Sequence, residues 1–245
     1  MEVGEVTGDG KGMASADGLL EVIVLSVDDA RAAERGGAGR LEIVRDLDRE
    51  GLTPAFDLVA RIVAAVSIPV RVMLRAREPF DGHAEGDLDA LAEAAVRFST
   101  LGVDGFVTGF LKGGAVDLNA LGRVLAGVPG SRVTFHRAFE AAADADAALE
   151  SLKLDALVDR VLATGGTGAW PGRAERLERL ARQARPRIIP VAAAGVDEAG
   201  IKYLRDRTSV REFHVGRAAR DEARVDRPVS AARVAALARA VAGLA

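Results

Sequence analysis

Several carboxylate, guanidinium and imidazole side chains lie within short apolar runs, not in the polar segments between those runs. They are Glu42 in RLEIV, Arg75 at the end of PVRVMLR, His136 and Arg137 in RVTFHRA, and His214 in EFHV. A charge within a buried strand must be paired or must face a wet opening, because burying it alone is costly. Carboxylates and imidazoles exchange protons, and guanidinium groups bind anions through paired hydrogen bonds. This set of residue types is typical of acid–base chemistry on an anionic ligand.

Eight short runs rich in Val, Ile, Leu or Phe are the elements that must position these side chains, and each is typical of a strand buried on both faces. They span residues 19–25, 40–44, 69–75, 104–110, 132–138, 160–163, 187–193 and 212–215. The segments between them carry helix signals. We expect helices over 26–36, from Thr53-Pro54, from Asp87 to Gly102, and over 116–127, 144–157, 173–185, 197–206 and 229–244. Eight strand–helix units predict a (β/α)8 TIM barrel, with a doubly wound open sheet as the alternative.

In such a barrel the functional site is built at the C-terminal ends of the strands. We therefore expect Glu42, His136, Arg137 and His214 to be catalytic, and Arg75 and Arg77 to bind an anion. Alternation along a strand sends one of His136 and Arg137 toward the barrel and the other toward the helices, and the sequence does not say which. An ion-pair network that only fills the barrel is the competing interpretation of these charges.

Glycines that follow the later strands suggest a phosphate site, which TIM barrels often build there from loop backbone and a short helix. The candidate residues are Thr164, Gly165, Gly195, Gly216 and Arg217. Neither a Walker loop nor a Rossmann fingerprint is present. No lysine lies within a strand run, which disfavours a Schiff-base aldolase.

Three further features of the sequence are not expected to take part in catalysis. His83, in the loop PFDGHAEGD, is expected to be a solvated loop residue. Trp170 is expected to be either a lid residue or a surface anchor. The arginines of 173–187 are interleaved with glutamates and are expected to form a solvated helix face.

Composition excludes several classes of protein. The chain has 245 residues and a formal net charge of −3, which gives no general attraction to nucleic acid. It has no cysteine, which excludes disulfides, thiolate nucleophiles and a Cu(I)–thiolate site. No secretory signal or membrane span is recognisable in the sequence, and the absence of disulfides allows a cytoplasmic location. Residues 1–17 are expected to be a disordered N-terminal tail, and residues 18–245 a single barrel domain.

Several segments, in order, resemble the CutC family, historically called copper homeostasis proteins. VTFHRAFE (133–140) resembles the family's VTFHRAFD, and PVRVMLRAR (69–77) its PVHVMIRPR. The opening (19–44) is also similar, as are EGLTP (50–54), GVDGFVTG (102–109) and EFH (212–214). The resemblance implies a TIM barrel, a cytosolic location, copper as a ligand, and a homodimer or larger homo-oligomer. The positions that match family motifs are Glu21, Glu42, Arg75, His136, Arg137 and His214.

This chain also departs from the family pattern. Ile23 and Val44 stand where the family often has cysteines, and Ala76 interrupts its Arg-Pro-Arg. Any metal site would therefore need Glu21, Glu42, His136 or His214, which suit harder ions than Cu(I). Two functions stay open: a copper-handling protein without catalysis, and a small-molecule enzyme that acts on an anion. The expected partner is accordingly a small molecule or a metal ion.

Overall fold

The computed structural model describes residues 18–244 and places the eight predicted strands in one closed parallel barrel. In barrel order the strands are β1 (Leu19–Val24), β10 (Glu212–Val215), β9 (Ile189–Ala192), β8 (Val158–Ala163), β7 (Arg132–Phe135), β4 (Gly105–Thr108), β3 (Val70–Met73) and β2 (Arg40–Ile43). The first and last strands pair in parallel, with Glu21 opposite His214. This pairing closes the sheet, so the predicted (β/α)8 barrel is confirmed and the open sheet is wrong. The predicted tail, 1–17, lies outside the described residues.

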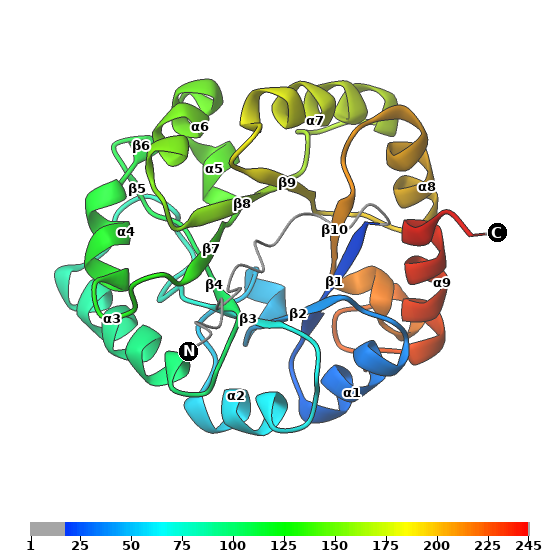
Figure 1. Cartoon of the computed structure of the whole chain (residues 1–245), viewed down its shortest axis with the longest axis horizontal. Coiled ribbons are helices and arrows are strands. Elements are labelled where there is room, and N and C mark those ends of the chain that lie inside the picture. Colours follow the sequence, from blue (N-terminus) through cyan, green and yellow to red (C-terminus); the bar gives the residue numbers. More distant parts are fainter. Residues whose placement is uncertain (1–17, 245) are drawn as a thin grey trace, which may run out of the picture.

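Helices surround the barrel (Figure 1). They are α1 (Val27–Arg35), α2 (Phe56–Val63), α3 (Glu85–Ser99), α4 (Leu118–Leu125), α5 (Ala138–Ala141), α6 (Ala145–Leu154), α7 (Trp170–Ala184), α8 (Glu198–Arg207) and α9 (Ala231–Ala242). Short 3-10 turns are η1 (Leu47–Arg49), η2 (Arg217–Ala219) and η3 (Asp221–Ala223), and a small hairpin joins β5 (Leu111–Lys112) to β6 (Ala115–Val116). None of the described helices is both long and apolar enough to cross a membrane.

The predicted start of α2 at Thr53-Pro54 is wrong by two residues. The helix begins at Phe56. The hydroxyl of Thr53 instead donates to the carbonyl of Arg75 at 3.0 Å and accepts from its backbone N–H at 2.8 Å. This pair of hydrogen bonds fixes the chain after β2 to the end of β3, so the helix can start only beyond it.

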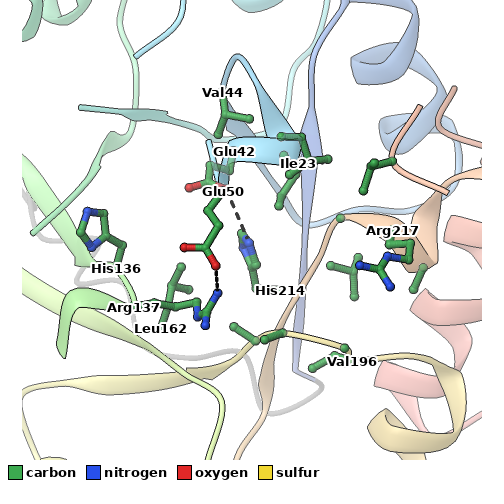
Figure 2. Close-up of a pocket in the computed structure, with 18 of the residues that line it drawn as sticks. Ile23, Glu42, Val44, Glu50, His136, Arg137, Leu162, Val196, His214 and Arg217 are labelled. Carbon is green, nitrogen blue, oxygen red and sulfur yellow. Dashed lines mark hydrogen bonds and ion pairs between the residues drawn. The ribbon is translucent and has the colours of Figure 1, made fainter. Parts of the chain in front are cut away.

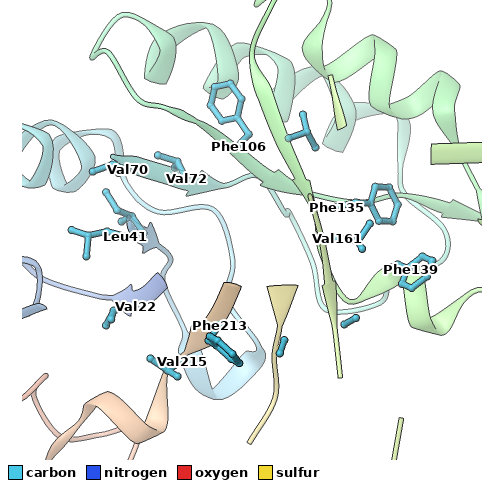
Figure 3. Close-up of a cluster of buried hydrophobic side chains, with 14 of the residues drawn as sticks. Val22, Leu41, Val70, Val72, Phe106, Phe135, Phe139, Val161, Phe213 and Val215 are labelled. Carbon is cyan, nitrogen blue, oxygen red and sulfur yellow. The ribbon is translucent and has the colours of Figure 1, made fainter. Parts of the chain in front are cut away.

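Alternate strand residues form the outer core between the sheet and the helices. In Figure 3, Val22, Leu41, Val72, Phe106 and Phe213 lie in this layer, and all are essentially inaccessible to solvent. With few aromatics in the sequence, Val, Leu and Ala supply most of the packing. Burial of this apolar layer is the main stabilising term of the fold.

The barrel interior is filled by two different layers. Toward the N-terminal ends of the strands, charges alternate in a belt made of Glu21, Arg40, Glu212, Arg160, Asp159, Arg71 and Asp104. The belt is buried except at Asp159 and Asp104, which are half-buried. Toward the C-terminal ends lies an apolar cluster made of Ile23, Val44, Met73, Val107, Leu162, Val191 and Ala193. The belt satisfies its own charges, and the apolar cluster forms the lower wall of the site above it.

Candidate functional site

A cavity of about 760 Å³ opens at the C-terminal mouth of the barrel (Figure 2). Strand alternation turns Glu42 of β2 and His214 of β10 inward, and the segment that follows β7 supplies His136 and Arg137. Closure of the barrel therefore brings together side chains that are far apart in sequence. The predicted residues that line this cavity are Glu42, Arg75, His136, Arg137, Gly195, His214, Gly216 and Arg217.

A chain of hydrogen bonds and ion pairs connects the cavity to the buried belt. His214 Nε2 lies 3.5 Å from a carboxylate oxygen of Glu42, and His214 Nδ1 lies 2.7 Å from Glu21. Glu21 accepts in turn from Arg40, which also binds Glu212 at 3.1 Å. Glu42, His214, Glu21 and Arg40 thus form one continuous relay, whose outer end is Glu42.

Glu42 is held in an unusual protonation state. Its side chain is buried, and its Oε1 has no hydrogen-bond partner within residues 18–244. Burial raises the pKa of its carboxyl to about 7, because the attraction of His214 only partly offsets the loss of water and the charge of Glu21 raises the value further. A carboxyl that titrates near neutrality can both release and accept a proton at physiological pH.

His214 is biased toward its charged form. Burial opposes the imidazolium, but the carboxylates of Glu42 and Glu21 outweigh it and raise the pKa of His214. The pKa of Glu21 is lowered: burial disfavours its charge, but Arg40 and His214 together overcome that effect. Glu21 therefore stays ionised beneath the cavity and fixes the orientation of the His214 ring.

Three arginines supply positive charge around the cavity. Arg75 is buried, lies 4.6 Å from the centre of the Phe80 ring, and donates to the carbonyls of Glu50 and Gly51 at 3.3 Å. Arg137 is half-exposed and pairs with Glu50 at 2.6 Å, the contact drawn in Figure 2. Arg217 is exposed in the segment after β10. An incoming anion can pair with these groups without entering the apolar floor.

Both His136 and Arg137 line the cavity, so the expectation that one faces the helices is wrong. Strand β7 ends at Phe135, and Arg137 already has helical angles, φ −59° and ψ −8°. Alternation applies only within the strand and no longer governs these two positions. Gly109 makes room for His136, because a Cβ there would lie 2.7 Å from His136 Nδ1.

The remaining predicted anion ligands lie elsewhere. Arg77 pairs with Asp87 at 2.6 Å outside the cavity. Thr164 and Gly165 line a neighbouring depression, and their backbone N–H groups donate to Glu140 at 2.8 and 3.0 Å. The Glu140 carboxylate thus occupies the position expected for an anion.

Two other expectations fail, one wholly and one in part, because of tertiary packing. His83 is not a solvated loop residue: it is half-buried and lies 3.2 Å from Asp117, the N-cap of α4. Of the arginines predicted on a solvated helix face over 173–187, Arg179 and Arg182 are exposed as predicted. Arg173 is half-buried, and Arg173 and Arg176 donate to loop carbonyls at the ends of β8 and β9. Trp170 begins α7 and lies under the guanidinium of Arg173, 3.9 Å from it.

Several residues that shape the site were not predicted. Glu50, Phe80 and Glu140 sit in or next to loops, and each contacts a residue from a different strand–helix unit, which for Phe80 is His136. EGLTP, which contains Glu50, carried part of the family resemblance but no chemical signal of its own. Charge in a loop is usually solvated, so composition alone does not single these residues out.

The metal candidates do not form a metal site. Glu21 and Glu42 approach opposite nitrogens of His214, so the three side chains cannot converge on one ion. Within residues 18–244 no group of three or more His, Asp and Glu side chains could hold a metal ion. Ile23 and Val44 are packed in the apolar cluster with Met73. The donor set does not fit copper, and least of all Cu(I), which prefers thiolate and thioether sulfur.

Residues 18–219 match the CutC family. A family protein CutC of Xylella fastidiosa is 38% identical over 208 residues, which cover 83% of this chain and 76% of the relative. The human copper homeostasis protein cutC homolog is 34% identical over 231 residues, 93% of this chain and 84% of that protein.

Solved structures agree on the fold. The CutC protein of Streptococcus agalactiae superposes with a TM-score of 0.74 at 22% identity, covering 81% of this chain and 98% of that one. A thiamine phosphate pyrophosphorylase from Pyrococcus furiosus gives 0.60 at 14% identity, covering 92% and 96%. These likenesses show the barrel alone, whereas the family match extends over most of the sequence. The chain belongs to the CutC family.

Proposed function

We propose that this member of the CutC family binds a small anionic molecule in the barrel cavity and catalyses a proton transfer on it. The anionic group is a phosphate or a carboxylate, the two groups that guanidinium binds best. The observation that carries the proposal is Glu42, a buried carboxyl with a pKa of about 7 and one oxygen without a partner among the described residues. Perturbed groups of this kind are concentrated in functional sites.

The relay behind Glu42 has a specific task in this proposal. When Glu42 takes a proton from the ligand, the attraction between its carboxylate and His214 is lost. His214, hydrogen-bonded to Glu21 at 2.7 Å, keeps its orientation throughout because Glu21 is anchored by Arg40. The site can therefore cycle between two protonation states without rearranging, which is the preorganisation that catalysis requires.

In this proposal the anion is bound by Arg137 and Arg217, the two arginines at the edge of the cavity. Arg137 and Glu50 both line the cavity, and their ion pair is exposed enough for a ligand to replace the Glu50 carboxylate. Arg217 lines the cavity from the segment after β10, next to Gly216. Exposed ion pairs are weak, about 0–1 kcal/mol, so the exchange of Glu50 for a ligand anion costs little.

Copper binding by this chain is not part of the proposal. The name of the human relative refers to copper homeostasis. In this chain the cysteine positions hold Ile23 and Val44, and the cavity offers hard oxygen and imidazole donors that do not converge. A cytoplasmic location and a homo-oligomeric state are retained as proposals that rest on the family resemblance, and light scattering after size exclusion measures the second.

Calorimetric titration with inorganic phosphate and with acetate tests the proposal. Phosphate or acetate should bind the wild type, and Arg137→Gln and Arg217→Gln should each weaken binding about tenfold or more, the effect of one charged hydrogen bond. Arg182→Gln is the matched control, because it removes an exposed arginine on α7 remote from the cavity. No binding of either anion to the wild type, or equal losses in all three variants, would refute the proposal.

A further inference from the structure

The two ring nitrogens of His136 have different surroundings. Nδ1 accepts a hydrogen bond from the backbone N–H of Ala138 at 3.2 Å. An acceptor nitrogen carries no hydrogen, so the neutral ring must hold its hydrogen on Nε2. Gly109 permits this arrangement, since a side chain there would collide with the Nδ1 edge of the ring. The local backbone thus selects the Nε2–H tautomer.

His136 also stays neutral. It is buried beside Phe80, with ring centres 5.1 Å apart, and the guanidinium groups of Arg75 and Arg137 are its charged neighbours. Burial, followed by the charge of Arg75, lowers the pKa of His136 to about 3. At physiological pH the ring is therefore a neutral hydrogen-bond donor and not a proton-releasing imidazolium.

The donor of His136 has no partner in the described part of the chain. Its Nε2 is buried without a hydrogen bond, in a residue that lines the cavity. Glu42 Oε1 is likewise buried without a partner, and Glu42 lines the same cavity from another strand (Figure 2). Arg75 Nε and Arg137 Nε, on two more residues that line this cavity, are also buried without a partner in the described residues. A buried polar group without a partner destabilises a fold, so four of them around one cavity call for a functional reason.

We propose that the ligand is an anionic carbonyl compound with a hydrogen on the carbon next to the carbonyl, and that His136 Nε2–H binds the carbonyl oxygen. This inference rests on the proposed function and gives it a substrate class. Glu42 removes the hydrogen as a proton, and the electron pair of the broken C–H bond forms a C=C bond. The π pair of the C=O bond moves onto oxygen, where His136 stabilises the enolate. Glu42 then returns a proton to the same carbon, so the step is a reversible exchange of the α proton and needs no oxidant or co-reactant.

A purely structural role for His136 would account for the hydrogen bond at Nδ1 but not for Nε2, which is buried without a partner in the part of the chain that the structure describes. The bond from Ala138 uses only Nδ1, and an asparagine could accept it with its side-chain oxygen. A histidine with only this structural role would gain nothing from burying its Nε2 without a partner in residues 18–244. Neutrality also matters to the proposal, because a neutral imidazole stabilises an enolate oxygen without protonating it fully.

The first test is the tautomer of His136, measured by ¹⁵N NMR of histidine-labelled protein and assigned with His136→Asn. The spectrum should show a neutral ring protonated on Nε2 from about pH 5 to about pH 8, a range centred on the ordinary histidine pKa. A ring protonated on Nδ1, or one that titrates within this range, would overturn the inference. Neither result depends on whether phosphate binds.

The second test uses phosphoglycolohydroxamate, which mimics an enolate, and 2-phosphoglycolate, which carries the same phosphate without that mimicry. The wild type should bind the hydroxamate more tightly. His136→Asn, which keeps the acceptor for Ala138 but loses the donor, should weaken hydroxamate binding about tenfold or more, and by a larger factor than it weakens binding of 2-phosphoglycolate. His136→Gln, whose amide N–H reaches the Nε2 position, should restore part of the loss.

The two proposals fail in different ways in this design. The carbonyl assignment alone is overturned if the wild type binds phosphate normally but binds the hydroxamate no more tightly than phosphoglycolate. It is also overturned if the wild type and His136→Asn bind the hydroxamate with equal affinity. Failure of the wild type to bind either inorganic phosphate or acetate overturns the proposed function itself. Thermal melts of both His136 variants must show a single cooperative transition, so that any change in affinity refers to a folded protein.

Discussion

Replacing Glu42 with glutamine should mainly change how the free energy of unfolding depends on pH. In the wild type, burial keeps the folded carboxyl protonated up to a pKa of about 7, against an ordinary value of 4.5. The difference corresponds to about 3 kcal/mol, at about 1.4 kcal/mol per pH unit. Glutamine has nearly the same shape and cannot ionise, so it removes this contribution.

The sign follows from proton uptake. Between 4.5 and about 7 the unfolded carboxyl has lost its proton while the folded one retains it. The folded state then binds more protons, so wild-type stability falls as the pH rises through this window. His214 changes wild-type stability with pH in the same direction. Burial lowers the pKa of His214, but the Glu42 carboxylate helps to raise it, and this contribution of Glu42 is absent in Glu42→Gln.

Urea unfolding of both proteins at about pH 5 and about pH 8 measures the effect, because the difference between them cancels other titrating groups. The free energy of unfolding of Glu42→Gln minus that of the wild type should rise by about 3 kcal/mol from the lower to the higher pH. Glu93→Gln, exposed on α3, is the control and should show no such rise. A difference that does not change with pH, or a loss on the order of 3 kcal/mol at both values, would mean that Glu42 only fills the barrel as part of an ion-pair network.

Three further predictions concern the buried belt of charges, the space that Gly109 leaves for His136, and copper binding. Arg40→Met leaves the buried carboxylates of Glu21 and Glu212 without their shared partner, and should lower the free energy of unfolding by about 3–5 kcal/mol in urea titrations near neutral pH; a change under about 1 kcal/mol would show that the belt is dispensable. Gly109→Ala forces His136 to move and should cost about 1–3 kcal/mol and weaken hydroxamate binding; unchanged binding would argue against the placement of the ring. The purified protein should release Cu(I) to a strong chelator, and a stoichiometric complex that survives the competition would contradict the reasoning from its donor set.

The sequence predicted the barrel because its strands are short, apolar and regularly spaced, and because glycine or capping residues separate them from the helices. Ser26 shows this locally: its hydroxyl accepts from Asp29 N–H at 3.0 Å and begins α1 as expected. Glu42 and His214 were predictable for a related reason. Strand alternation and barrel closure together require inward side chains at strand ends to meet.

Contacts between loops were not predictable in the same way. The pairing of Glu50 with Arg137 joins residues from two different units, and no local pattern connects them. The Glu140 carboxylate accepts hydrogen bonds from the N–H groups of Thr164 and Gly165 only because α5, which carries Glu140, follows β7 directly. A glycine-rich segment indicates where backbone N–H groups are available, but tertiary structure decides whether a ligand or a side chain takes them.

The titration of the Glu42 side-chain carboxyl is the most direct test of the acid–base site. It can be followed by carbon-detected NMR, assigned by comparison with Glu42→Gln, with and without inorganic phosphate. The account predicts a midpoint near 7 in the free protein. Bound phosphate should raise this midpoint further, because a second negative charge in the same cavity disfavours the carboxylate. A midpoint near the ordinary value of 4.5 that phosphate leaves unchanged would contradict both the proton-transfer role of Glu42 and the placement of the anion beside it.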